Sequence, residues 1–353
     1  MTFYKRIQAV LQLTIPLGIL FFLILLFIYH SDRIQQKALN KKQIEQQLSS
    51  VHQKIVKPYK GVKIGLALGA GGAKGFAHIG VIKVLQENGI PVRIVVGTSA
   101  GSVVGVLYAY GFDAKAIQRI LTDVGFALMD FDLSFTGFIQ GKKLKELVNR
   151  SINHLPLEAL SKKFGVVATD FSSGDTILLT QGDAGQAVRA SSSIPAIFKP
   201  AEIAGRLYVD GGLSAPVPVS QARRLGADVV IAVDISSHPA EQGALYQPSS
   251  WFSTIDHSIS ILINKQVEGE LKKADVVIQP KLSSTEFLNF FSMDSTIEAG
   301  ERAARRALPK IKAAIEKAKQ EKMLLQATSS SARNVDRNNF EQGGSGTSKE
   351  WIF

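Results

Sequence analysis

The sequence predicts an α/β fold: a three-layer α/β/α sandwich around a largely parallel sheet, preceded by a transmembrane helix. Three observations predict it. Strand and helix patterns alternate along residues 62–227, which is typical of a sheet covered by helices on both faces. After Asp228, residues 229–233 form an unbroken apolar run, as a strand of a buried parallel sheet does. Residues 7–31 contain no Asp, Glu, Lys or Arg, and their apolar centre is long enough to cross a bilayer.

Along the chain, short apolar runs predict the strands and longer periodic segments predict the helices. The predicted strands are residues 63–68, 94–96, 164–169, 177–179, 207–209, 228–233 and 275–278. The first predicted helix follows a glycine-rich loop and ends at residue 87. The other predicted helices cover residues 103–110, 251 to about 270, and 295–322. Gly89 and Pro91 end the first of these helices.

Ser99 lies in the pentapeptide Gly97-Thr98-Ser99-Ala100-Gly101, which is a G-x-S-x-G pattern. An apolar run precedes it and a second one follows, which is the strand–turn–helix setting of a nucleophile elbow. The glycines permit a turn that is too tight for a Cβ atom. The serine oxygen would then stand at the N-terminus of a helix, where negative charge is favoured. A Gly-Ser turn without chemistry is the alternative.

A glycine-rich loop follows the first predicted strand: Gly69-Ala70-Gly71-Gly72-Ala73-Lys74-Gly75. Such a loop between a strand and a helix presents backbone N–H groups to an anion. A dinucleotide fingerprint that starts at Gly69 would need a glycine in place of Lys74, and a P-loop would need Ser or Thr in place of Gly75. A tetrahedral oxyanion is compatible with the spacing, and a tight packing turn without a ligand is the alternative.

A third segment, Asp210-Gly211-Gly212, ends the predicted strand over residues 207–209. A carboxylate at a strand end beside two glycines is held in place without being enclosed. Taken by itself, this segment is better explained as an ordinary Asp-Gly turn.

Taken together, the three segments resemble the patatin-like phospholipase family, in which a glycine loop, G-x-S-x-G and D-G-[GA] follow in this order on matching elements. The stretch over 190–196, Ala-Ser-Ser-Ser-Ile-Pro-Ala, also looks like that family. The resemblance covers about residues 62–320, and the combination of motifs is specific although each motif is weak. One departure is Ala70, which stands where the loop of the family often has its first glycine.

The resemblance implies a Ser–Asp dyad that cleaves carboxylic esters of lipids without a histidine. Carried over by position, Ser99 is the nucleophile, Asp210 takes its proton, and the N–H groups around Gly71 and Gly72 form the oxyanion hole. The implied substrate is a membrane phospholipid or lysophospholipid. We expect no metal and no cofactor, because a dyad needs neither and the sequence has no H-E-x-x-H motif and no Cys/His cluster.

Two other function classes stay open. An α/β-hydrolase triad runs in the order Ser, Asp, His, which Ser99, Asp210 and His238 satisfy. His257 satisfies the order too, but it lies inside a helical pattern. A membrane-tethered scaffold without activity would be favoured by a missing nucleophile, base or oxyanion loop, and all three are present. Measured esterase activity separates the enzyme from the scaffold.

Charge and composition limit the kinds of molecule that the chain is expected to bind. The net charge is +11, and residues 1–60 hold nine Lys or Arg against two Asp or Glu. The basic excess therefore flanks the apolar segment over 7–31 and does not form a nucleic-acid-binding face on the domain. Cysteine is absent, which excludes disulfides and a thiol nucleophile. The oligomeric state is left undetermined.

The chain divides into an anchor over 1–31, a polar basic linker over 32–61, the patatin-like domain over 62–322 and a disordered tail over 323–353. We expect a single-pass protein of the bacterial inner membrane. More Lys and Arg residues follow the span than precede it, which favours a cytoplasmic domain. A basic start can also insert in the opposite sense, which would place the domain in the periplasm. A cleavable signal peptide is the runner-up, but no small-x-small cleavage site follows the apolar run.

Overall fold

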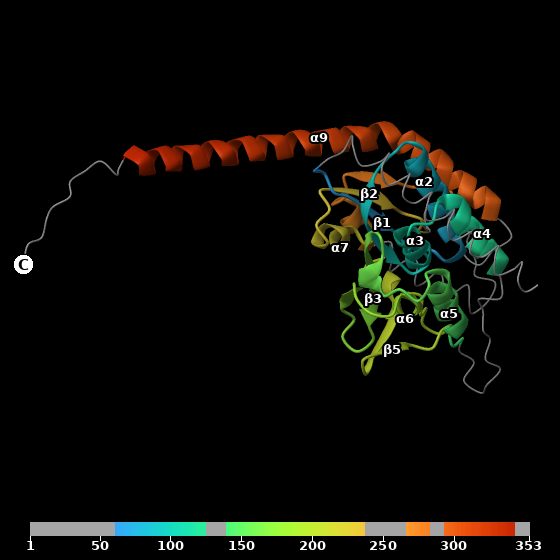
Figure 1. The fold of residues 1–353 in the computed structure, drawn as a ribbon. Coiled ribbons are helices and arrows are strands. Elements are labelled where there is room, and N and C mark those ends of the chain that lie inside the picture. The colour runs from blue at the N-terminus through green and yellow to red at the C-terminus, as the bar shows by residue number, and fades with distance from the viewer. Residues whose placement is uncertain (1–60, 125–138, 237–265, 283–292, 343–353) are drawn as a thin grey trace, which may run out of the picture. The chain divides into compact units, whose positions relative to one another are not determined.

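The computed structural model describes residues 61–124, 139–236, 266–282 and 293–342, with side chains up to residue 326 (Figure 1). The strands are β1 (Ile64–Leu68), β2 (Val92–Thr98), β3 (Lys163–Asp170), β4 (Thr176–Leu179), β5 (Ala201–Ile203), β6 (Arg206–Asp210), β7 (Val229–Val233) and β8 (Val276–Ile278). The helical elements are η1 (Gly72–Gly75), α2 (Phe76–Glu87), α3 (Ala100–Tyr110), α4 (Ala114–Val124), α5 (Lys142–Ser151), η3 (Leu157–Ala159), α6 (Ala184–Ser191), η4 (Gly211–Leu213), α7 (Val219–Arg224) and α9 (Met293–Gln342).

Within the described residues, the strands form one mixed sheet with a parallel core. The strands β3, β2, β1, β7 and β8 are neighbours in that order, and each neighbouring pair is parallel. β4 and β6 pair with β3 in the antiparallel sense, and β5 pairs with β6 in the same way. The predicted α/β class with a mostly parallel sheet is therefore confirmed.

Successive side chains of the parallel strands enter two hydrophobic clusters on opposite faces of the sheet. On β1, Leu66 and Leu68 join a cluster with residues of α2, α3 and α9, whereas Ala67 joins a second cluster with Val219 of α7. α9 packs along α2 (Figure 1). Because both faces are covered, β1 and β7 are buried along their whole length, which explains their unbroken apolar sequences.

Strand β3 brings the ends of β2 and β6 together. β4 pairs with the C-terminal half of β3 along one edge, so β2 and β6 share the opposite edge. β2 ends with Thr98 opposite Val167 of β3. β6 runs in the other direction and ends with Asp210 opposite Ala168, the next residue of β3. The C-terminal ends of two strands far apart in the sequence therefore meet head to head.

The predicted strands are present, with bounds that differ by up to two residues. β5 and the helices α4 to α7 were not predicted. β5 is three residues long and has the exposed Glu202 at its centre, so it carries no apolar pattern. Of the helix predicted from residue 251 to about 270, the structure describes residues 266 onward, and these are helical.

The last helix is longer than predicted. The sequence placed its end at residue 322 and a disordered tail after it, but α9 continues to Gln342. The polar composition of residues 323–342 suggested disorder, yet this stretch contains neither glycine nor proline, the residues least compatible with a helix.

The anchor predicted over 1–31, nearly all of the linker over 32–61 and residues 343–353 lie outside the described residues. Among the residues that the structure describes, no helix is both long enough and apolar enough to span a membrane.

Candidate active site

Ser99 occupies the turn between β2 and α3, as the G-x-S-x-G pattern predicts. Its backbone has φ 52° and ψ −121°, in a region that costs a residue with a Cβ atom about 1–3 kcal/mol. Two hydrogen bonds fix the turn. The Thr98 hydroxyl donates to Ala215 O at 2.9 Å, and the Ser102 hydroxyl donates to Ser99 O at 2.6 Å. The surrounding structure therefore holds Ser99 in a conformation that a serine rarely adopts.

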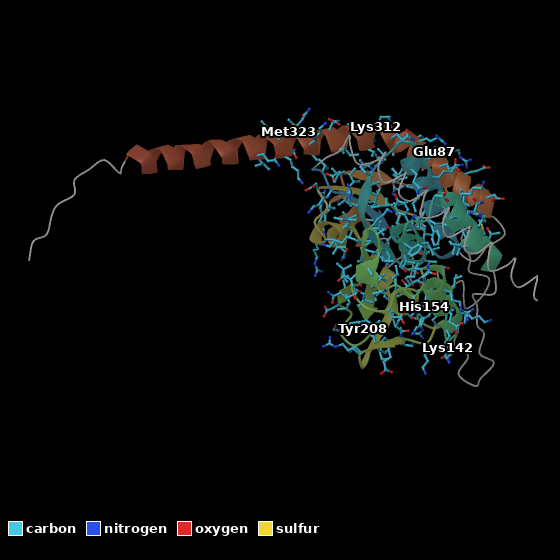
Figure 2. All side chains as sticks on the ribbon, in the orientation of Figure 1. Glu87, Lys142, His154, Tyr208, Lys312 and Met323 are labelled. Carbon is cyan, nitrogen blue, oxygen red and sulfur yellow. The ribbon has the colours of Figure 1, made fainter. Side chains whose placement is uncertain are left out.

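The Ser99 hydroxyl donates a hydrogen bond to the carboxylate of Asp210. Oγ and Oδ2 are 2.7 Å apart, although the two residues are separated by 111 positions in the sequence. Asp210 is the last residue of β6, two residues after Tyr208, which is labelled in Figure 2. The second carboxylate oxygen, Oδ1, accepts a hydrogen bond from the Gly212 N–H at 2.7 Å. The head-to-head meeting of β2 and β6 thus places a hydroxyl against a carboxylate.

Burial changes the acidity of this carboxyl group. Asp210 is 6% exposed, and burial raises its pKa from 3.8 to about 6, against the opposing effect of the hydrogen bonds from Ser99 and Gly212. The group is therefore ionised at neutral pH but binds a proton more strongly than an ordinary aspartate. These are the two properties that a general base near neutral pH needs.

The glycine-rich loop packs directly against the Ser99 turn. A Cβ atom on Gly101 would lie 2.2 Å from the Leu68 carbonyl oxygen, and one on Gly75 would lie 2.7 Å from the Cβ atom of Ala100. A Cβ atom essentially never makes non-bonded contacts this short, so a larger residue at either position would push the loop and the turn apart. These two glycines therefore place the loop beside Ser99.

The loop is anchored at its start and has free donors at its centre. The Gly69 N–H donates to Val233 O at 3.0 Å and the Ala70 N–H donates to Pro216 O at 2.9 Å. His78 Nε2 lies 2.9 Å from Gly69 O. Gly71 and Gly72 are partly exposed, and among the described residues their N–H groups donate to no protein oxygen. Free N–H groups beside a serine hydroxyl can stabilise negative charge on a reacting oxygen.

Most of the other motif residues are buried around the site. Ala73, Gly97 and Gly211 are buried, and Lys74 is 1% exposed, so Lys74 is not a solvated surface charge.

Several residues around the pair were not predicted. Ser191 Oγ accepts a hydrogen bond from the Ser99 N–H at 2.8 Å, and Ser193 O accepts one from the Asp210 N–H at 2.9 Å. Both serines lie in the family-like stretch over 190–196, but the sequence alone assigned them no role. His78 was missed as well, and its one signal was a polar residue within an apolar helix.

The histidines considered for a triad, His238 and His257, lie outside the described residues. Within the part of the chain that the structure describes, no histidine nitrogen forms a hydrogen bond with the Ser99 hydroxyl or the Asp210 carboxylate.

The fold and the site define an α/β protein with a serine–aspartate pair at two strand ends and a glycine-rich loop beside it. Residues 66–223 match the model of the patatin-like phospholipase family. The resemblance inferred from the three motifs is therefore confirmed.

Individual relatives cover part of the chain. An uncharacterized NTE family protein of Mycobacterium tuberculosis is 34% identical over 212 residues, which are 57% of this chain and 58% of that protein. Lysophospholipase NTE1 of Pyricularia oryzae is 35% identical over 185 residues, which are 50% of this chain and 12% of that protein. Among solved structures, VipD from Legionella pneumophila is similar with a TM-score of 0.44 and 16% identity, over 70% of this chain and 66% of VipD. The chain thus spans little more than half of the first relative and a small part of the second.

Proposed function

We propose that this chain is a membrane-anchored serine hydrolase that cleaves carboxylic ester bonds of phospholipids, lysophospholipids or related lipids. The observation that carries the proposal is the 2.7 Å hydrogen bond from the Ser99 hydroxyl to the buried Asp210 carboxylate. The phospholipase family whose model matches residues 66–223 and the lysophospholipase among the relatives support a lipid ester as the substrate.

In the proposed reaction, Ser99 Oγ attacks the ester carbonyl carbon while its proton moves to Asp210. A serine hydroxyl is a weak nucleophile until a base lies within hydrogen-bond reach, and Asp210 meets that condition. The tetrahedral intermediate collapses to an acyl-serine, and the leaving alcohol oxygen takes the proton from Asp210. Water then enters, gives a proton to Asp210 and hydrolyses the acyl-serine, after which that proton returns to Ser99.

The negative charge of the tetrahedral intermediate requires donors that are already in place. We assign this role to the N–H groups of Gly71 and Gly72, which are free of protein partners among the described residues. The loss of one such donor typically costs about 3 kcal/mol of transition-state stabilisation. The Ser99 N–H is excluded from this role because it already donates to Ser191.

The direct contact between Ser99 and Asp210 supports the dyad over a Ser99–Asp210–His238 triad, in which the histidine would stand between the two. His238→Ala should retain most of the activity if the dyad operates. The triad would be favoured if that variant were as inactive as a variant without the nucleophile. A catalytically silent scaffold is the third reading, and any wild-type ester hydrolysis that depends on Ser99 excludes it.

The test of the proposed function combines covalent labelling with product analysis. A fluorophosphonate probe should modify Ser99 and leave Ser102 unmodified, because the Ser102 hydroxyl is buried and donates to a backbone carbonyl. Mass spectrometry of the purified protein acting on mixed bacterial phospholipids should reveal free fatty acid and a lysophospholipid or deacylated product. Labelling at another serine, or intact lipids after prolonged incubation, would contradict the proposal.

We also propose that residues 1–31 hold the protein in the bacterial inner membrane, with the domain on the cytoplasmic side. Full-length protein should resist extraction by high salt or alkaline carbonate, because burial of a long apolar segment is not screened by salt as surface charge is. A chain that starts at Val62 should be soluble and should hydrolyse short-chain esters at the full-length rate, since Ser99, Asp210 and the glycine-rich loop all follow that residue.

The same shortened chain should hydrolyse phospholipid in vesicles more slowly, because it has lost the tether that concentrates it at the substrate surface. Release of the full-length protein by salt alone would contradict the anchor. A shortened chain that folds but does not cleave soluble esters would contradict the assignment of the active residues to the domain.

A further inference from the structure

We propose that Ser191 is a positioning residue whose buried hydroxyl holds the backbone of Ser99 in line with Asp210. The inference rests on the proposed function, because it concerns the alignment of the same nucleophile and base. It is carried by three contacts that no motif in the sequence describes, all made by the turn over residues 191–193, which we call the serine turn.

The first two contacts place the Ser191 hydroxyl inside the sheet, at the junction of β2 and β6. Its Oγ accepts a hydrogen bond from the Ser99 N–H at 2.8 Å and donates one to Val167 O at 2.5 Å. Val167 is the residue of β3 opposite Thr98, where β2 ends. The hydroxyl therefore links a backbone donor just after β2 to a backbone acceptor of β3, in place of the direct hydrogen bond of a continued strand.

The third contact ties the same turn to the base. Ser193 O accepts a hydrogen bond from the Asp210 N–H at 2.9 Å. The serine turn thus contacts the backbone N–H of the nucleophile through a side chain and the backbone N–H of the base through a carbonyl. Because both contacts come from residues two positions apart, the turn fixes how far the Ser99 and Asp210 backbones lie from each other.

The serine turn is itself well anchored. Ser191 is 0% exposed and is the last residue of α6. The buried side chain of Arg189, in the last turn of α6, donates from Nε to Gln140 O at 2.9 Å and from Nη2 to Lys199 O at 3.0 Å. A rigid support of this kind transmits position to Ser99, whose backbone is strained and would relax if it were released.

Ser191→Ala is the variant that tests the role, and Ser192→Ala is its matched control. The control removes a neighbouring hydroxyl that is buried and has no hydrogen-bond partner among the residues that the structure describes. Ser191→Ala should lower kcat by about 10- to 100-fold with KM within about twofold of wild type, since small misplacements of a reacting group cost this much. Ser192→Ala should keep kcat within about twofold. Urea unfolding of both variants checks that each is folded under the assay conditions.

The pH dependence of activity distinguishes a loss of alignment between Ser99 and Asp210 from a general loss of packing around residue 191. The hydrogen bond from Ser99 lowers the pKa of Asp210 against the effect of burial, and the other opposing contact is the Gly212 N–H. If Ser99 moves out of line in Ser191→Ala, the pKa of Asp210 in the free protein rises, and the midpoint of the kcat/KM–pH profile should shift to higher pH. Amide hydrogen exchange at Ser99 should also become faster in this variant, and not in Ser192→Ala.

The outcomes are distinct. An active wild type with unchanged kcat and unchanged pH midpoint in Ser191→Ala would overturn the role of Ser191 and leave the proposed function in place. An equal loss of kcat in both variants would overturn it too, because the Ser192 hydroxyl forms no hydrogen bond with Ser99 or Asp210. A wild type that neither labels at Ser99 nor hydrolyses esters would overturn the proposed function, and the role of Ser191 with it.

Discussion

Asp210→Asn is expected to lower kcat by about 10²-fold or more while it stabilises the folded protein at neutral pH. The loss of activity follows because an amide cannot take the Ser99 proton, and general bases usually contribute at least this factor. In the wild type, kcat/KM should rise with pH around a midpoint near 6, where the Asp210 carboxyl of the free protein loses its proton. The exposed Asp175, in the turn before β4, offers a matched control, because Asp175→Asn should change neither kcat nor stability.

The gain in stability follows from the proton balance of Asp210. Between pH 3.8 and about 6, the folded state holds a proton on this residue that the unfolded state has released. The free energy of unfolding of the wild type therefore falls as the pH rises through this window, and it stays lower above it. Asn does not ionise, so the unfolding free energy of Asp210→Asn does not fall through the titration of this residue.

Urea unfolding of Asp210→Asn and of the wild type measures this effect. The difference in unfolding free energy between them should grow by about 2–3 kcal/mol in favour of the variant from about pH 4 to about pH 7.5. Any change in unfolding free energy that does not depend on pH cancels in this comparison. A difference that stayed constant with pH would contradict the raised pKa of Asp210.

Ser99→Ala should reduce ester hydrolysis to the background rate and abolish labelling by the fluorophosphonate probe. The variant should keep its fold, because the Asp210 carboxylate retains the Gly212 N–H as a donor. Ser99→Gly should be equally inactive but more stable than Ser99→Ala by about 1 kcal/mol, because glycine adopts φ 52° without strain. Residual turnover in both variants would show that another residue is the nucleophile.

The secondary structure near the site could be predicted because its signals are local. β1 and β7 are buried on both faces and so are apolar throughout, and Ser99 lies between two apolar runs that became β2 and α3. β5 and the extension of α9 could not be predicted in this way. The first is too short for a pattern, and the composition of the second resembles that of disordered segments.

The site itself could be predicted only through the family resemblance. Nothing local in the sequence shows that Asp210 meets Ser99, because their contact depends on two strands that share one edge of β3. Ser191 illustrates a further limit. Its hydroxyl acts by joining two backbone groups from different strands, and a serine in that role has the same sequence context as a serine at any helix end.

His78, which contacts the glycine-rich loop through Gly69 O, also affects how the protein exchanges protons with solvent when it unfolds. Because the carbonyl can only accept, Nε2 carries the proton, and Nδ1 is buried without a partner among the described residues. Burial lowers the pKa of His78 from 6.5 to about 4, against the opposing effects of the Gly69 hydrogen bond and the charge of Asp234.

In mild acid, unfolding therefore adds a proton to His78 and removes one from Asp210. Between about pH 4 and about pH 6 the unfolded state binds one proton more at His78 and one fewer at Asp210, so the two contributions to the pH dependence of stability have opposite signs and nearly cancel. In the wild type, these two groups together therefore change the free energy of unfolding little between about pH 4 and about pH 6, although the Asp210 carboxyl beside the strained Ser99 gains a proton in this range. Without the carboxylate, His78 alone would make the fold lose stability as the pH falls.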